Sequence, residues 1–146
     1  MSYSYIINVE AAIMKNGQFL LIQRSPEEEH AGGLYSLPGG KMEFSPDSLD
    51  VLEDNVRREI KEEIGLTLDG DLTYVHSNTF LIGDIQVLNV VFLTADFKGE
   101  PYIKSPEEVA DMVWVEPDLN ESPVPIPPWT ANSIQKAVER QSKIYF

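Results

Sequence analysis

Runs of apolar residues along the chain predict a series of β-strands. The runs over 5–14 and 19–24 flank Asn16-Gly17, a dipeptide typical of a tight hairpin turn. Val87 to Leu93 is apolar and β-branched enough for a central strand. This run lies in a predicted strand at residues 86–96, and further strands are predicted at residues 34–37, 72–80 and 111–116.

Two segments show helical spacing instead. The first begins near Ser48 or Asp50, either of which can cap a helix, and ends at Gly65. Its apolar residues recur every three or four positions: Leu49, Leu52, Val56 and Ile60. The second follows a stretch with four prolines, opens at Trp129-Thr130 and runs to about Arg140.

Strands on both sides of one helix, with a second helix last, predict an α+β fold in which a mixed β-sheet is sandwiched between α-helices. A length of 146 residues suits a single domain over residues 1–146. The chain has 24 acidic and 11 basic residues, a net charge of −13, which argues against duplex nucleic acid and anionic membranes as partners. It has no cysteine, no signal-like start and no apolar run long enough to span a membrane, so a cytoplasmic location is expected.

A group of acidic residues on the first helix is the strongest chemical signal. Residues 58–66 read Arg-Glu-Ile-Lys-Glu-Glu-Ile-Gly-Leu, and helical spacing places Glu59, Glu62 and Glu63 on neighbouring positions of one surface. Acids at this spacing usually form a solvated face. They also suit a hard divalent cation such as Mg²⁺ or Mn²⁺, which takes oxygen ligands. The glycine-rich turn at 37–43, which leads toward this helix, favours the second interpretation.

Residues 40–66 together resemble the Nudix box: Gly, five residues, Glu, seven residues, then Arg-Glu-U-x-Glu-Glu-x-Gly-U, where U is bulky and apolar. The second half matches at Arg58, Glu59, Ile60, Glu62, Glu63, Gly65 and Leu66. The first half departs, because nine residues separate Gly40 from Asp50, the position expected to hold the glutamate. We therefore expect a longer loop through 44–47. In the family that glutamate supports the arginine, a role that falls here to Asp50 or, after a register shift, to Glu53.

The resemblance to MutT-like Nudix hydrolases implies hydrolysis of a diphosphate linkage in a nucleoside diphosphate linked to another moiety, with Mg²⁺ or Mn²⁺ as cofactor. It implies Glu62 and Glu63 as metal ligands, and Gly40 as a backbone carbonyl ligand. Glu59 is either a third ligand or the base, and Arg58 orients the acids. The partner implied is a small nucleotide-diphosphate substrate, and a homodimer is a family-level option.

Two further residues are weaker candidates for the substrate site. Arg24 ends a predicted strand and could meet a phosphate. Glu108, like Glu107, precedes the predicted 111–116 strand, where some Nudix enzymes place an additional base. For each, a solvated side chain is the simpler interpretation.

Other functions remain open at this point. A non-catalytic Nudix-like domain could bind a nucleotide or sugar nucleotide as a sensor, although the complete set of acids favours an enzyme. An isomerase on this fold would need a cysteine, which the chain lacks. The aromatic residues Tyr74, Phe80 and Trp129 could stack on a nucleobase, but such residues more often belong to the core.

Overall fold

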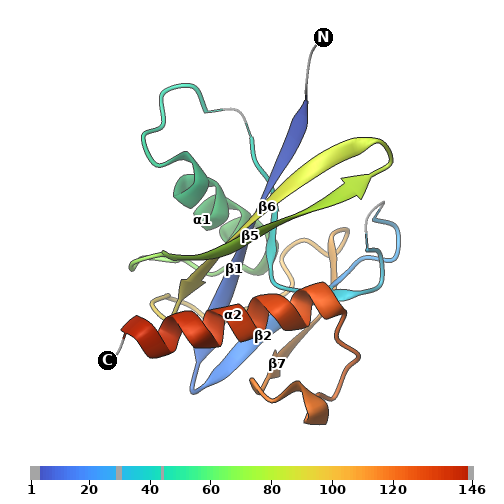
Figure 1. The fold of residues 1–146 in the computed structure, drawn as a ribbon, viewed down its shortest axis with the longest axis vertical. Helices are drawn as coiled ribbons and strands as arrows, with labels where there is room; N and C mark the ends of the chain where they lie inside the picture. Colours follow the sequence, from blue (N-terminus) through green and yellow to red (C-terminus); the bar gives the residue numbers. More distant parts are fainter. Residues whose placement is uncertain (1–3, 29–30, 44, 145–146) are drawn as a thin grey trace.

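The structure is a computed structural model that describes residues 4–28, 31–43 and 45–144 (Figure 1). Its strands form one mixed sheet in the order β3-β2-β1-β6-β5, with β4 paired to β1 and β7 paired to β2. The strands are β1 (Tyr5–Lys15), β2 (Gln18–Arg24), β3 (Tyr35–Ser36), β4 (Gly39–Lys41), β5 (Thr73–Ile82), β6 (Ile85–Thr94) and β7 (Val109–Val115). The helices are α1 (Val51–Ile64), the 3-10 helix η1 (Leu119–Glu121) and α2 (Pro128–Ile144).

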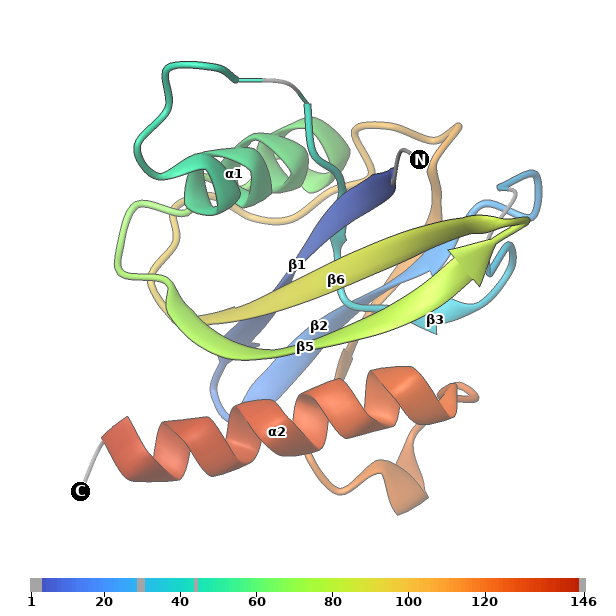
Figure 2. The same cartoon turned by 45° about the horizontal axis from the view of Figure 1, so that its top comes forward.

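The two long helices cover opposite faces of this sheet (Figure 2). Val9, Ala11 and Ile13 of β1 pack with α1, whereas Ala12 belongs to the core under α2. This alternation follows from the two-residue period of a strand, which sends successive side chains to opposite faces. The predicted α+β sandwich is confirmed, and the strand lengths follow the apolar runs closely.

The sheet forks beside β1, and this fork positions the site. The β1–β2 hairpin turns at Asn16 and Gly17, both with positive φ, as its tight turn requires. The two strands pair only next to that turn, and β2 then diverges to pair with β7. In the space that β2 leaves, β4 pairs with β1, placing Gly39 opposite Glu10. The glycines predicted as a turn therefore begin a short strand inside the sheet.

Helix α1 begins slightly later than its apolar spacing suggests. Asp50 is the N-cap residue but makes no capping bond with its side chain, and Leu49 is 98% exposed. The prediction that Leu49 belongs to the apolar spacing of the helix is therefore wrong, because the chain before Val51 is still in the lengthened loop. Val56 and Ile60, which follow the same spacing, are fully buried.

Helix α2 begins one residue before the predicted start, at Pro128, where a missing backbone N–H is harmless. It also extends beyond the predicted end, to Ile144. Neither α2 nor any other helix among the described residues has the length and apolar character that crossing a bilayer would require.

Gly65 ends α1 in a left-handed conformation, with φ 72° and ψ 11°. A Cβ at this position would overlap the ring of Tyr102, which would have to move to make room for it. Gly83, in the turn between β5 and β6, also has positive φ but has open space around it.

We predict that Gly65→Ala lowers the free energy of unfolding by more than the matched Gly83→Ala. Both substitutions place a side chain on a residue in the left-handed conformation, which lowers the free energy of unfolding by roughly 1–2 kcal/mol. Only Gly65→Ala must also displace Tyr102. Urea denaturation of the two variants measures the difference, and equal losses would contradict a steric role for the ring.

Candidate active site

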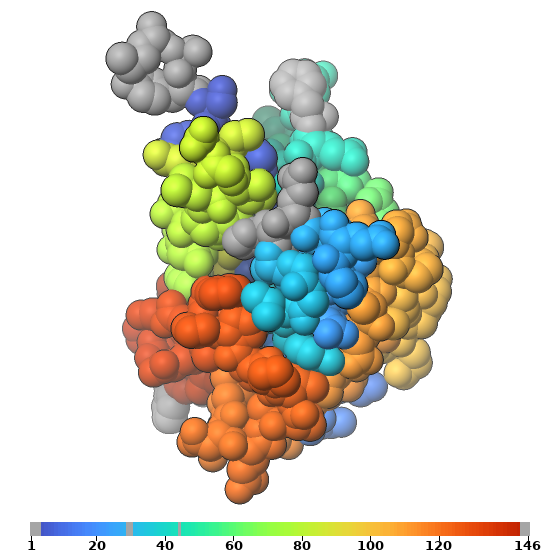
Figure 3. Space-filling view, turned by 90° about the vertical axis from the view of Figure 1, so that its right-hand side faces the viewer, coloured from blue at the N-terminus to red at the C-terminus, as the bar shows by residue number. Residues whose placement is uncertain are grey.

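A pocket of about 250 Å³ opens between the sheet, α1 and the start of α2. Figure 3 shows the face of the molecule where the β5–β6 hairpin, the segment after β2 and the first turns of α2 meet. Glu59 and Glu63 of α1 line one side of the pocket, together with the Gly39-Gly40 backbone. Residues of β1, β5 and β6 line the other. The fork in the sheet thus lets acids from the α1 side reach a pocket that extends under α2.

Glu63 is the most buried acid of the site, with only 4% of its surface exposed. Its Oε1 accepts a hydrogen bond from the Gly39 backbone N–H at 3.1 Å. Glu59 lies beside it, and a Cβ on Gly40 would overlap the Glu59 carboxylate. The glycine pair therefore lets two carboxylates approach the backbone of β4 closely.

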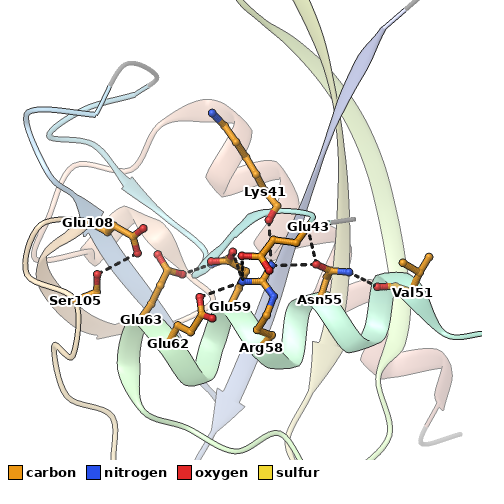
Figure 4. Close-up of polar contacts among 11 residues, drawn as sticks. Lys41, Glu43, Val51, Asn55, Arg58, Glu59, Glu62, Glu63, Ser105 and Glu108 are labelled. Atoms are coloured by element: carbon orange, nitrogen blue, oxygen red, sulfur yellow. Dashed lines mark hydrogen bonds and ion pairs between the residues drawn. The ribbon is translucent and has the colours of Figure 1, made fainter. Parts of the chain in front are cut away.

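Glu62 lies apart from these two acids, at the outer rim. Its side chain is 57% exposed, and its Oε2 pairs with Arg58 at 3.0 Å (Figure 4). Across the described ranges, no three acidic or histidine side chains form a group at metal-ligand spacing. The assignment of Glu59, Glu62, Glu63 and the Gly40 carbonyl as ligands therefore stays a prediction.

Arg58 is held by a different set of residues from the one expected. The prediction that Asp50 or Glu53 would support Arg58 is wrong. Glu43, just after β4, lies 3.4 Å from the guanidinium, and Asn55 Oδ1 accepts from it at 3.0 Å (Figure 4). The lengthened loop explains the change, because it leaves from the end of β4 and carries Glu43 past the second turn of α1 instead of supplying an acid at the helix start.

Asn55 connects these parts. It is 2% exposed, donates to Val51 O at 2.8 Å and accepts from the Glu43 N–H at 2.9 Å. It thereby fixes the loop against the helix, while Arg58 bridges to Glu59 and Glu62, each at 3.0 Å. Arg58 has the contacts that an orienting role requires. Asn55 lies three residues before Arg58, and this helical spacing was a signal in the sequence that was not used.

Burial and the charges of neighbouring acids raise the pKa of both inner acids. Desolvation, followed by the charges of Glu59 and Glu108, raises the pKa of Glu63 to about 9, against the smaller opposing effects of the Gly39 N–H and Arg24. Desolvation also raises the pKa of Glu59, and Arg58 offsets part of that rise. A site that crowds carboxylates in this way favours a bound cation, and an all-oxygen donor set fits Mg²⁺ or Mn²⁺.

Arg24 and Glu108 both line this pocket, so the structure brings the two weaker candidates to the acids of α1. Arg24 lies 3.7 Å from Glu28 in an ion pair. Glu108 accepts from Ser105 Oγ at 3.1 Å, and the backbone N–H of Ser105 donates to Glu63 O at 3.3 Å. The loop that carries Glu108 is therefore attached to the end of α1, although the Glu108 side chain itself is exposed.

Sequence reasoning missed a polar network on the sheet side of the pocket. Asn89 of β6 donates to Glu10 Oε1 at 2.8 Å and to Asn78 Oδ1 at 3.0 Å, and accepts from Asn8 at 2.8 Å. Burial raises the pKa of Glu10 to about 7, although the Asn89 bond and Arg24 oppose the shift. The available signal was Asn8 and Glu10 on alternate positions of an otherwise apolar strand.

Comparison with known proteins agrees with this architecture. The family model for the NUDIX domain matches residues 6–137. The chain is similar to the nucleoside triphosphatase NudI of Escherichia coli O17:K52:H18 (strain UMN026 / ExPEC), with 28% identity over 114 residues that cover 73% of this chain and 78% of that protein.

Solved structures give the same result. A MutT Nudix hydrolase from Burkholderia pseudomallei has 28% identity and a TM-score of 0.76, covering 91% of this chain and 98% of that one. The MutT protein from Methanosarcina mazei Go1 has 27% identity and a TM-score of 0.78, covering 98% and 99%. Because the family model spans most of the sequence, the chain belongs to the Nudix family.

The raised pKa of Glu63 predicts how the metal-free protein responds to pH. In the folded state the Glu63 carboxyl group keeps its proton, whereas in the unfolded chain it releases that proton as the pH rises above its ordinary pKa of 4.5. Stability should therefore fall as pH rises from about 5 to about 8 in the presence of a chelator. Glu63→Gln removes this proton, so its melting temperature should be higher than wild type at about pH 8 and should depend less on pH.

Glu62→Gln is the matched control for this measurement. It makes the same chemical change one residue away, but on an exposed carboxylate. It should keep a slope close to that of wild type, and Glu10 and Glu59 should leave a residual slope in every variant. Parallel curves for wild type and Glu63→Gln would show that Glu63 is not protonated in the folded protein.

Proposed function

We propose that this protein is a divalent-metal-dependent hydrolase that cleaves the diphosphate linkage of a nucleoside triphosphate or a related nucleoside diphosphate derivative. The observation that carries the proposal is the buried carboxylate of Glu63 against the Gly39 N–H, next to Glu59 in a pocket large enough for part of a nucleotide. The similarity to a nucleoside triphosphatase supports triphosphates as the first substrates to test.

The residues present fit Mg²⁺ or Mn²⁺. We assign Glu62, Glu63, Glu59 and the Gly40 carbonyl as the groups that would hold the ion. When bound, such an ion neutralises charge on phosphoryl oxygens and makes a water molecule more acidic. Glycine at position 40 is consistent with this assignment, because a side chain there would push Glu59 away.

The other side chains have distinct roles in this proposal. Arg58 orients Glu59 and Glu62 through its two ion pairs. Glu59, whose pKa is raised, is either a ligand or the group that accepts a proton from the attacking water. Arg24 and Glu108 both line this pocket. In this proposal Arg24 would meet a phosphate, and Glu108 would serve as an additional base.

Hydrolysis is tested by incubating the protein with nucleoside triphosphates, ADP-ribose and dinucleoside polyphosphates plus Mg²⁺, and by following the phosphate products. A sensor would leave each ligand intact. Glu63→Gln and Glu62→Gln should each lower kcat by about a hundredfold or more, because each removes a charged oxygen ligand. Undiminished turnover in either variant would refute its assignment as a ligand.

Glu53→Gln is the control, because Glu53 lies on the same helix but does not line the pocket. It should retain wild-type activity. Mg²⁺ should also raise the melting temperature of the wild type and fail to do so for Glu63→Gln, since a ligand that binds only the folded state stabilises it. An equal rise in both proteins would place the metal elsewhere.

A further inference from the structure

Asn55 is a buried polar side chain in the middle of α1. Only 2% of its surface is exposed. Its Nδ2 donates to Val51 O at 2.8 Å, and its Oδ1 accepts from the Glu43 backbone N–H at 2.9 Å and from Arg58 Nη2 at 3.0 Å (Figure 4). Two of these partners only donate and the third only accepts, so they fix which way the amide faces.

The two terminal nitrogens of the Arg58 guanidinium have different surroundings. Nη1 faces carboxylates, because it lies 3.0 Å from an oxygen of Glu59 and 3.0 Å from an oxygen of Glu62. Nη2 instead donates to two neutral oxygens, Asn55 Oδ1 at 3.0 Å and the Lys41 backbone carbonyl at 3.3 Å. One end of the guanidinium therefore meets the acids proposed to hold the ion, and neutral groups hold the other end.

The neutral charge of the amide has an electrostatic consequence. A hydrogen bond to a charged group is stronger than one between neutral groups, so the Asn55 oxygen can hold the guanidinium without adding a competing negative charge. Glu43 also approaches Arg58, but at 3.4 Å and with a side chain that is 68% exposed, where ion pairs contribute little. The positive charge of Arg58 therefore remains available to Glu59 and Glu62.

The same amide oxygen also holds the loop after β4. It accepts from the backbone N–H of Glu43, two residues after the end of the Gly39–Lys41 strand. The carbonyl of Lys41 in that strand is the second acceptor for Arg58 Nη2. Asn55 thus joins the guanidinium and the strand that carries Gly40 at one buried point.

We propose that Asn55 is a positioning residue for the reaction, whose amide oxygen holds Nη2 of Arg58 so that Nη1 orients Glu59 and Glu62. This inference rests on the proposed function and adds a residue to it. Asn55 is not among the described residues that line the pocket, so it acts through Arg58.

The first test is the activity of Asn55→Ala toward a nucleoside triphosphate with Mg²⁺. The variant should lower kcat by about tenfold or more, because it removes a buried hydrogen bond to a charged group. KM should stay within about twofold of the wild-type value, since the change removes no group that lines the pocket.

Arg57→Met is the matched control for a general weakening of α1. Arg57 is next to Arg58 in the chain, and its guanidinium donates to Leu68 O and Gly70 O after the helix. The substitution also removes bonds between α1 and a loop, but Arg57 is not among the residues that line the pocket. It should lower the free energy of unfolding and leave kcat unchanged.

Two further variants show which partner of Asn55 is responsible. Asn55→Asp keeps an oxygen for Arg58 and loses only the donor to Val51, so its kcat should fall between those of wild type and Asn55→Ala. An equal loss in both variants would show that the amide serves the start of the helix alone. In an Arg58→Ala background, Asn55→Ala should lower kcat no further, and a second full loss there would contradict a role through Arg58.

Side-chain NMR signals of Arg58, recorded with a chelator, keep this inference distinct from the proposed hydrolysis. They are identified as the signals that Arg58→Ala lacks. A guanidinium held at Nη2 by a buried oxygen rotates slowly, so Nη1 and Nη2 should give separate signals in wild type and in Arg57→Met. The signals should merge in Asn55→Ala.

The two sets of measurements distinguish the possible failures. Separate signals that merge in Asn55→Ala, without hydrolysis of any nucleotide, would overturn the hydrolase and keep Asn55 as the residue that holds Arg58. Hydrolysis with a kcat that Asn55→Ala leaves unchanged would keep the hydrolase and refute the positioning role. Merged signals in the wild type would refute that role without the need for any folded variant.

Discussion

The site depends on the hydrogen bond from the Gly39 backbone to the buried carboxylate of Glu63. A carboxylate removed from water is stable only when it is protonated, paired or bound to a cation, and this one has a single backbone donor and two acidic neighbours. The fold provides the donor by pairing β4 with β1 in the fork of the sheet. The same fork opens the sheet face to the pocket, so one irregularity in strand pairing creates both sides of the site.

Around this bond, some residues position the acids and the loop, and other residues line the pocket. Arg58 and Asn55 hold the loop after β4, and Arg58 also pairs with Glu59 and Glu62, whereas Glu59 and Glu63 line the pocket. The guanidinium is shared among several oxygens, which makes its position insensitive to any one of the acids. An extended loop can therefore replace the usual spacing of the box without disturbing the inner acids, because Glu43 approaches Arg58 from the loop itself.

Local sequence patterns were sufficient for most of the elements. Two-residue alternation and apolar runs indicated the long strands, and Gly65 marked the end of α1, because these signals depend on neighbouring residues alone. The strand at 39–41 and the contact between Glu43 and Arg58 were not predicted, since both depend on contacts between segments far apart in the chain. The Asn89 network was missed for the same reason: its members come from three strands, and nothing in any one strand shows which residues it will face.

The parallel pairing of β1 with β6 has a consequence for how the chain acquires its structure. Asn8 and Asn89 meet although 81 positions separate them, and β1 lies between β6 and both β2 and β4 in the sheet. During synthesis, the first strand therefore has only its hairpin partner and β4 until most of the polypeptide has emerged. Closing such a large loop before the contact forms is entropically unfavourable, so this central pairing should be a late and slow event in folding. A chain interrupted before β6 would leave the polar wall of the pocket without its central amide.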